Sequence, residues 1–571
     1  MNKNFLLLLL VYFIVACNPF RKNDNSSIDP YHYVTQKTIT ADNGAVVTAH
    51  ALASKVGVQI FQQGGNAIDA AIAVQFTLAV VFPGAGNIGG GGFLVARLSD
   101  GKEITLDFRE MAPAKSYRDM YIDSNGNART DWSQAGHLSS GVPGVVAGMF
   151  ALMKYAKLSF DKLIQPAIDF AEKGFVIDAR EADGLNGLQG DLIKYNTVMP
   201  VFVKNSGWKA GDTLIQTDLA NTLKRIKEKG AAGFYEGETA RLIVEEMKRA
   251  NGIISYEDLK NYKAIFREPH VFYYKGYKVI GMPMPSSSGL LINQMMKMVE
   301  KKDIGKMGFQ SADATQLMIE AERRAFADRA EYMGDADYYK VPVKVLSSDK
   351  YLDDRMKDYE PGKAGTSTTI QPGNTADYES SETTHFSIAD KYGNMVSVTT
   401  TLNDTYGSRT VVGGAGFILN DEMDDFSIKP GTPNMFGAVG GEANAVHPGK
   451  RMLSSMSPTL VLKDNKPFLV AGTKGGTTIP TSIFQTLVNI IDFGMSTEDA
   501  VNKSKFHHQW LPDEVEAETG FPMAIIDSLK KMGYKIKPRD EIGRTEVIKI
   551  LPNGKLEAVG DRRGDDDAEG W

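Results

Sequence analysis

Apolar residues recur along the chain with two different periods. Short β-branched runs begin near Val46 and alternate with segments in which apolar residues follow the helical period, without a long linker between them. Helices are predicted for residues 52–63, 67–80, 313–333 and 479–493. This alternation predicts one mixed α/β body rather than a string of separate domains.

A β-hairpin is predicted in the second half of the chain, where two strand-like runs flank a short loop that ends at Gly393. A three-residue loop with glycine in the left-handed position pairs Asp390 with Asn394. The same register places Thr401 directly opposite Thr383. Their Cβ atoms would then be about 5 Å apart, so their hydroxyl groups would interact unless a bulge shifts the register by one residue.

Charge narrows the classes of function. Among 571 residues the formal net charge is −6, and Lys and Arg are spread along the chain, which disfavours binding to nucleic acid or to an anionic membrane surface. The glycine run 89–92 is not followed by the Lys-Ser/Thr of a phosphate loop, and no Gly-x-Ser-x-Gly elbow is present. Chemistry on a small molecule, without a nucleotide, is therefore favoured.

The N-terminus has the features of an export signal. Lys3 precedes an apolar run over residues 5–16, which is too short to span a bilayer comfortably. The run ends at Cys17, the only cysteine, in a context that resembles a bacterial lipobox; the alternative is a plain signal peptide with an incidental cysteine. We expect a signal peptide over residues 1–16, a lipid on Cys17, a polar tether over residues 17–39, and a location on the periplasmic or cell-surface face of a bacterial membrane. With Cys17 lipidated, disulfides, a cysteine zinc site and a cysteine nucleophile are excluded.

A polar segment leads directly into the predicted hairpin. Residues 366–382 are rich in Thr, Ser, Asn, Gly and acidic side chains, and we expect them to be exposed and mobile. Cleavage before Thr383 would create a new α-amino group beside its hydroxyl, and that amine can act as the general base that a threonine nucleophile needs. The alternative is an ordinary threonine-rich strand.

The residues around Thr383 resemble the processing site of the γ-glutamyltransferase family, and further runs resemble that family's motifs in its order and spacing. These runs are 86–93, 107–113, 141–144, 379–387, 400–407, 420–426, 451–458, 472–477 and 506–512. The resemblance extends from about residue 40 to the C-terminus. It implies an N-terminal nucleophile hydrolase fold, a four-layer αββα sandwich built jointly by two autoprocessed subunits. Cleavage between Glu382 and Thr383 would give a large subunit, residues 40–382, and a small one, residues 383–571, that remain together as a heterodimer.

The resemblance also implies roles for individual residues. Thr383 would be the nucleophile of both autoprocessing and catalysis, with Thr401 hydrogen-bonded to it, and the backbone N–H groups of Gly475 and Gly476 would form the oxyanion hole. A second set would bind the α-carboxylate and α-ammonium of a γ-glutamyl group. It consists of Arg109, Ser454 and Ser455 for the carboxylate, and Asn403, Glu422 and Asp425 for the ammonium.

The implied activity is transfer of a γ-glutamyl group from glutathione or other γ-glutamyl compounds to water or to amino-acid and peptide acceptors. It needs no cofactor and no metal, and His507 and His508 are interpreted as packing residues. Residues 430–450 resemble a lid loop over the site. One alternative is an acylase of the same family that acts on β-lactam side chains or on poly-γ-glutamate, against which Arg109, Asp425 and the lid argue. Another is an inactive surface-binding lipoprotein, against which the intact catalytic residues argue.

Overall fold

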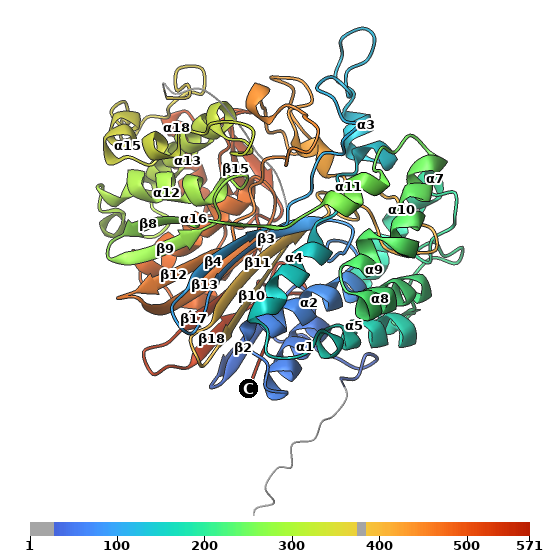
Figure 1. The fold of residues 1–571 in the computed structure, drawn as a ribbon. Helices are drawn as coiled ribbons and strands as arrows, with labels where there is room; N and C mark the ends of the chain where they lie inside the picture. Colours follow the sequence, from blue (N-terminus) through green and yellow to red (C-terminus); the bar gives the residue numbers. More distant parts are fainter. Residues whose placement is uncertain (1–27, 374–383) are drawn as a thin grey trace, which may run out of the picture.

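β-Branched and aromatic runs from the whole length of the chain assemble into two seven-stranded sheets (Figure 1). The computed structural model describes residues 28–373 and 384–571. The first sheet has the order β1-β18-β17-β13-β12-β9-β8. Its strands are β1 (Thr38–Ala41), β18 (Leu556–Val559), β17 (Arg544–Ile550), β13 (Lys466–Lys474), β12 (Thr459–Lys463), β9 (Tyr277–Gly281) and β8 (His270–Tyr274).

The second sheet has the order β19-β2-β10-β11-β3-β4-β7. Its strands are β19 (Asp567–Gly570), β2 (Gly44–Thr48), β10 (Thr384–Asp390), β11 (Met395–Thr401), β3 (Gly91–Arg97), β4 (Glu103–Asp107) and β7 (Ile265–Arg267). Smaller sheets pair β14 (Phe506–His507), β15 (Val515–Glu518) and β16 (Ile536–Arg539), and β5 (Phe175–Val176) with β6 (Thr213–Leu214).

Alternate residues of the central strands enter different apolar layers. On β2, Val46 packs with the helices α1 (Ala51–Gln62) and α2 (Ala67–Val81), whereas Val47 packs between the two sheets. On β13, Ala471 packs toward the helices of the other side and Val470 packs between the sheets. Because both sheets are covered on both faces, the architecture is helix, sheet, sheet, helix, and the predicted αββα sandwich is confirmed.

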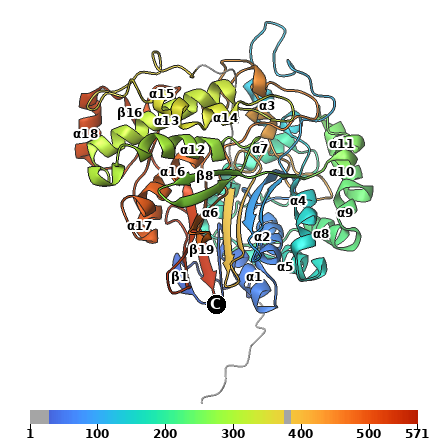
Figure 2. The ribbon, with the colours of Figure 1, turned by 60° about the vertical axis from the view of Figure 1, so that its left-hand side comes forward.

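Helices cover the two outer faces (Figures 1 and 2). Those near the second sheet include α1 (Ala51–Gln62), α2 (Ala67–Val81), α4 (Val145–Leu152), α5 (Phe160–Lys173), α8 (Thr217–Lys229), α9 (Ala232–Tyr235) and α10 (Gly237–Arg249). Those near the first include α12 (Ser288–Glu300), α13 (Ala312–Tyr332), α16 (Thr478–Ile491), α17 (Thr497–Asn502) and α18 (Met523–Met532). The remainder are α3 (Thr130–Gln134), α6 (Ala179–Gly187), α7 (Gln189–Tyr195), α11 (Tyr256–Asn261), α14 (Val343–Leu346) and α15 (Asp349–Arg355). The four predicted helices correspond to α1, α2, α13 and α16.

The hairpin has the predicted register. Thr384 lies opposite Thr400, and the amide of Asp390 donates to the carbonyl of Asn394 at 3.1 Å. Gly393 has φ 85°, in the left-handed region, as the loop type requires. No bulge interrupts β10 and β11. The Thr383–Thr401 pair itself stays a prediction, because Thr383 lies outside the described residues.

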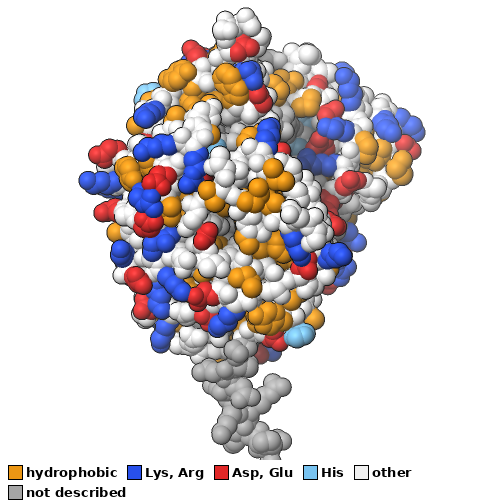
Figure 3. Space-filling model, turned by 90° about the vertical axis from the view of Figure 1, so that its right-hand side faces the viewer, with side chains coloured by type: hydrophobic (Ala, Val, Ile, Leu, Met, Phe, Trp, Pro, Cys, Tyr) orange, Lys and Arg blue, Asp and Glu red, His pale blue; other side chains and the backbone are white. Residues whose placement is uncertain are grey.

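The folded body begins before residue 40. Thr38 and Ile39 already belong to β1, and Tyr33 Oη donates to the carbonyl of Val176 at 2.6 Å. The described part of the predicted tether therefore lies against the body. Cys17 lies outside the described residues, within which no helix is long and apolar enough to cross a membrane. On the face shown in Figure 3, acidic and basic side chains are interspersed.

Candidate active site

Three strands reach the same edge of the packed sheets. β10 begins and β11 ends there, and β13 ends there in the facing sheet, since the imidazole of His385 lies against the backbone of Gly472. A side chain at Gly472 would overlap this ring, so the approach requires glycine. Ser397 Oγ donates across the sheets to the carbonyl of Ala471 at 3.0 Å. The edge therefore brings Thr401, the last residue of β11, near the glycine pair that follows β13.

Gly475 and Gly476 form the turn from β13 into α16. Their φ angles are 130° and 71°, which side chains rarely adopt. The carbonyl of Gly476 accepts from the amide of Ile479 at 2.8 Å, so the pair is joined to the first turn of a 14-residue helix. The positive end of that helix dipole favours negative charge. This position fits the predicted oxyanion role, which stays a prediction.

Thr401 is buried, and hydrogen bonds fix its side-chain hydroxyl and its backbone carbonyl. Its Oγ1 accepts from the amide of Asn403 at 2.7 Å, and its carbonyl accepts from Asn87 Nδ2 at 2.8 Å. The hydroxyl keeps its own proton to donate, since it acts as acceptor in the contact with Asn403. The predicted nucleophile Thr383 and the cleavage residue Glu382 lie outside the described residues, so their roles stay predictions.

Arg109 is the centre of a buried charge cluster. Its Nη1 pairs with Glu422, its Nη2 pairs with Asp425, and Glu110 lies 3.6 Å from Nη1. Nε donates to the carbonyl of Met452 at 3.3 Å. The family resemblance implies that Arg109 and the two later carboxylates contact opposite ends of one ligand. The structure brings these side chains together, and Arg109 pairs with both carboxylates.

Electrostatics in this cluster are strongly perturbed. Burial favours loss of the Arg109 proton, but Glu422, Asp425 and Glu110 hold the pKa of Arg109 above its ordinary value. Burial raises the pKa of Glu422 well above its ordinary value, and raises the pKa of Glu110 to about 7 against the opposing charge of Arg109. Because one guanidinium faces three carboxyl groups, the cluster has spare acceptor capacity for a bound ammonium group.

The two predicted serines adjoin this cluster. Arg109 Nη2 donates to the carbonyl of Leu453 at 3.4 Å, and Ser454 and Ser455 follow directly, both fully buried. Ser455 Oγ accepts from Arg329 Nη2 at 2.5 Å. The serine pair therefore lies between two buried guanidinium groups, which is a favourable environment for a carboxylate.

Asn403 connects Thr401 to the carboxylate cluster. It has φ 77°, a left-handed conformation that asparagine tolerates, and its Nδ2 donates to the carbonyl of Asp421 at 3.2 Å. Among the described residues its buried Oδ1 has no hydrogen-bond partner. That acceptor fits the predicted contact with an ammonium group. Nδ2 also lies 3.6 Å from Met435 Sδ, which belongs to the predicted lid loop.

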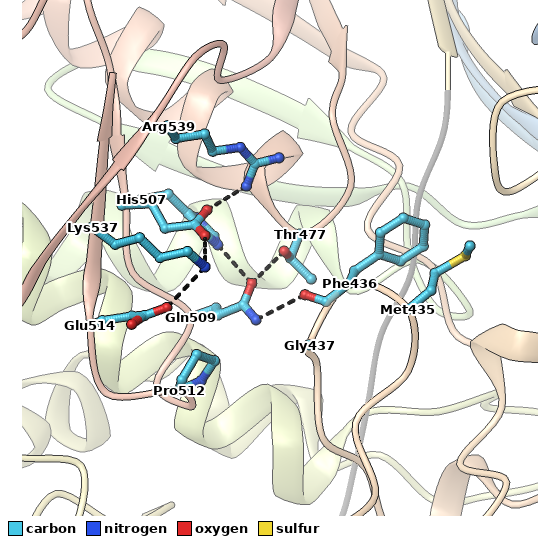
Figure 4. Close-up of a pocket in the computed structure, with 11 residues that line it drawn as sticks. Met435, Phe436, Gly437, Thr477, His507, Gln509, Pro512, Glu514, Lys537 and Arg539 are labelled. Carbon is cyan, nitrogen blue, oxygen red and sulfur yellow. Dashed lines mark hydrogen bonds and ion pairs between the residues drawn. The ribbon is translucent and has the colours of Figure 1, made fainter. Parts of the chain in front are cut away.

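A cavity of about 400 Å³ borders this loop (Figure 4). Met435, Phe436 and Gly437 form one wall, and the small sheet β14-β15-β16 contributes the opposite wall. Gln509 joins the two: its Nε2 donates to the carbonyl of Phe436 at 3.2 Å, and its Oε1 accepts from Thr477 Oγ1 at 2.5 Å. Since Thr477 follows the glycine pair, the cavity adjoins the candidate oxyanion hole.

The segment before the predicted cleavage site is better packed than expected. Ser367 and Ile370 are buried. The amide of Ser367 donates to Asp513 at 2.8 Å, and Trp510 Nε1 donates to the carbonyl of Ile370 at 2.9 Å. The prediction of an exposed segment is wrong at these residues. It rested on the polar composition of the segment, which carries no information about contacts with residues more than a hundred positions away in the chain. Residues 374–382 lie outside the described residues.

The histidine pair is buried and hydrogen-bonded. His507 Nδ1 lies 2.9 Å from Thr481 Oγ1, and His508 Nε2 lies 3.3 Å from Asp513. Burial lowers the pKa of His507 to about 3 and that of His508 to about 4. These contacts agree with a packing role.

Several site residues were missed. Glu110 follows Arg109 directly and shares its cluster, and Arg451 pairs with Asp107, whose other oxygen accepts from Arg267 at 2.7 Å. Asp107, Glu110 and Arg451 lie within the runs 107–113 and 451–458, which resemble family motifs. Their position in these runs could have identified them as candidate site residues. Arg329, in contrast, lies inside a long helix whose sequence gives no sign of its contact with Ser455.

Comparisons with protein families, sequences and solved structures all relate this chain to one protein family. A family model described as Gamma-glutamyltranspeptidase matches residues 53–571. The chain is 46% identical over 532 residues to the glutathione hydrolase proenzyme of Escherichia coli (strain K12), covering 93% of this chain and 92% of that protein. Similar solved structures include the cephalosporin acylase from Bacillus halodurans, with TM-score 0.83, 27% identity, and coverage of 96% and 99%. The Helicobacter pylori gamma-glutamyltranspeptidase has TM-score 0.56, 42% identity, and coverage of 60% and 97%.

Proposed function

Because the chain belongs to the gamma-glutamyltranspeptidase family, we propose that it transfers the γ-glutamyl group of glutathione or related compounds to water or to an amino-acid or peptide amine. The observation that carries this proposal is the buried cluster of Arg109, Glu422 and Asp425 beside Ser454 and Ser455. It offers cations and carboxylates together, which complement the α-carboxylate and α-ammonium of a γ-glutamyl group.

In the proposed mechanism the precursor is first cleaved between Glu382 and Thr383. The Thr383 hydroxyl then adds to the γ-carbonyl of the donor, and its proton passes to the new α-amino group. Backbone N–H groups at Gly475 and Gly476 would stabilise the oxyanion. The C–N bond breaks, the leaving amine takes the proton, and a γ-glutamyl ester of Thr383 remains.

In the second half-reaction the γ-glutamyl group leaves the threonine oxygen. Water or an acceptor amine adds to the ester carbonyl and gives a proton to the α-amino group. The ester C–O bond breaks, and the threonine oxygen recovers that proton. Thr401 fits a role in orienting the nucleophile, because its own hydroxyl is fixed by the amide of Asn403 at 2.7 Å.

The test compares wild type with Thr383→Ala and Thr383→Ser by denaturing gel, intact mass, N-terminal sequencing and release from a γ-glutamyl anilide. Wild type should give two chains, the smaller beginning at Thr383, and Thr383→Ala should stay whole and inactive. Thr383→Ser keeps a hydroxyl and should still be cleaved. An uncleaved wild type, or an active Thr383→Ala, would overturn the nucleophile assignment.

An acylase of side chains without an α-amino group is the second candidate, favoured by the likeness to the cephalosporin acylase. γ-Glutamyl and glutaryl anilides form a matched pair that differs only in this amino group. The cluster around Arg109 predicts a strong preference for the γ-glutamyl compound, and an equal or reversed preference would support the acylase.

Export and lipidation of Cys17 remain part of the proposal. They rest on the sequence alone, and mass spectrometry of the mature N-terminus tests them: an unmodified Cys17 would contradict them.

A further inference from the structure

A row of large apolar side chains lies open on the surface, close to the first described residues of the chain. Val198, Met199, Val201 and Ile215 are 42%, 56%, 44% and 44% exposed, and all four line one pocket of about 160 Å³. Tyr31, which is 43% exposed, extends this apolar row. Single exposed apolar side chains are common on proteins, but a contiguous group of them marks an interaction site.

The apolar row is continuous with the N-terminal segment. Tyr31 Oη donates to the carbonyl of Lys173 at 2.9 Å, and the next residue, Gly174, lies so close to Ile215 that a Cβ there would be 2.7 Å from Ile215 Cγ1. A groove of about 430 Å³ continues this surface from Tyr31 to Ile28, the first described residue. This side of the molecule faces the viewer in Figure 3, where hydrophobic side chains gather in the middle and lower part of the view.

The charges that flank the apolar row cancel. Lys173 pairs with Asp169 at 3.2 Å, and Lys204 pairs with Asp212 at 2.6 Å. The chain as a whole has a formal net charge of −6. These pairs give an anionic partner no excess of positive charge to neutralise. A partner that fits this surface therefore binds it through apolar contacts.

The length of chain that precedes Ile28 selects this partner. Ile28 is the eleventh residue after Cys17, so a lipid on Cys17 lies at most about 40 Å from Ile28, even along a fully extended chain. A folded body of this length has a radius of gyration of about 24 Å and is about 60 Å across. The lipid therefore cannot reach the far side of the body, and the bilayer lies next to the side around Ile28. Such tethering also makes a weak apolar contact effective, because the second binding event becomes intramolecular.

We propose that the apolar row is a membrane-contact surface. Val198, Met199, Val201 and Ile215 enter the boundary between headgroups and acyl chains of the bilayer that holds the lipid anchor, and they fix the orientation of the folded body on that bilayer. Tyr31 lies at the edge of the contact, in the headgroup region where tyrosine rings are favoured. The contact needs no anionic lipid. It goes beyond the proposed activity and rests on the proposed function only through the lipid anchor.

Two exposed methionines provide a matched pair of labelling positions. Met199 lies in the apolar row, and Met523, which is 66% exposed, lies on α18 in the helix layer of the other sheet (Figure 1). Cys17 is the only cysteine, so Met199→Cys or Met523→Cys adds the single free thiol of the lipidated protein. An environment-sensitive fluorophore is attached to this thiol.

Each labelled protein is placed on phosphatidylcholine vesicles that carry a quencher in their acyl chains. A second preparation has a hexahistidine tag in place of residues 1–17 and is held on the same vesicles by a small fraction of nickel-chelating lipid. This preparation attaches the body at the same end of the chain without an acyl group on Cys17. The result for the apolar row therefore does not depend on lipidation.

On vesicles the emission of the Met199 probe should shift to shorter wavelength. The acyl-chain quencher should quench it at least about twofold more than the Met523 probe, because side chains at the interface reach about 5–10 Å into the bilayer. The difference should persist in about 1 M salt, which screens ionic contacts but not apolar ones. Adding Val201→Asp and Ile215→Asp should abolish it.

Equal quenching of the two probes, or a difference that salt removes, overturns the apolar contact with the bilayer. A shift of the Met199 probe that appears without vesicles and grows with protein concentration would assign the apolar row to a second copy of the chain, which also overturns the proposal. An unmodified Cys17 in the mature protein would instead overturn the proposed lipidation, and the tagged preparation then decides the role of the row.

Discussion

Arg109 combines full burial with two carboxylate partners, and its planar fork lets each terminal nitrogen face a different one. Lysine has a single point charge and cannot satisfy both. We therefore expect Arg109→Lys to lower kcat/KM for a γ-glutamyl anilide about tenfold to a hundredfold. Arg241→Lys is the matched control, because Arg241 also pairs with two carboxylates, Glu238 and Glu245, and these pairs lie at the surface of α10. Equal activity of the two variants would remove Arg109 from the binding site.

Glu110 gives the cluster a pH dependence. Its pKa is raised by burial to about 7 in the folded protein, above the value of about 4.3 expected in an unfolded chain. The folded state therefore favours the neutral carboxyl, and this contribution to stability is complete below about pH 4 and is lost as the pH rises through 7.

Glu110→Gln replaces the carboxyl group with an amide of similar shape that is uncharged at every pH. Its free energy of unfolding should be close to that of wild type at pH 4 and higher by about 2–4 kcal/mol at pH 8. Thermal midpoints of both proteins at the two pH values measure this. A difference that shrinks or reverses at pH 8 would mean that Glu110 is ionised without cost in the folded protein.

At the scale of elements, the contact of β10 with β13 fixes the geometry of the candidate site. The ring of His385 is bonded on both nitrogens, to Thr399 Oγ1 at 3.1 Å and to Ser387 Oγ at 2.9 Å, so it cannot move aside freely for a new side chain on β13. A methyl group at position 472 would overlap the His385 ring. Gly472→Ala should therefore lower the free energy of unfolding by about 1–3 kcal/mol and impair the cleavage before Thr383.

Gly520→Ala is the control, because a Cβ there meets no atom within 4 Å and its effect should stay within about 0.5 kcal/mol. Thermal unfolding and a denaturing gel read out the two effects. If Gly472→Ala behaves like the control, the two strands do not need this close approach.

Elements with a local signal were predictable from the sequence. The apolar period predicted α1 and α2, the content of Ala, Glu and Arg predicted α13, and Pro480 marked the start of α16. The glycine loop predicted the register of β10 and β11. All of these signals depend on neighbouring residues. The pairing of Arg109 with Glu422 is different: it joins residues 313 positions apart and depends on how the sheets pack. The cavity beside the lid loop likewise combines Phe436 with β16, and no local pattern relates them.

At the scale of the whole molecule, strands from before and after residue 383 lie side by side in both sheets. In the described part of the chain, β1 pairs with β18 and β9 with β12 in the first sheet, while β2 lies between β19 and β10, and β3 pairs with β11, in the second. Each of these pairs would join the two proposed subunits by a ladder of backbone hydrogen bonds inside a shared apolar core.

Cleavage before Thr383 should therefore break the chain in two while both parts stay in one folded structure. We expect the mature protein to elute as one species in native size-exclusion chromatography, with both chains in the peak, even in about 1 M salt, since backbone ladders and apolar packing are not screened as surface ion pairs are. Uncleaved Thr383→Ala, the control, should elute at the same volume, and both chains of the mature protein should separate only after denaturation. Separation of the chains by salt alone would mean that ionic surface contacts hold the subunits together, which interleaved strands do not allow.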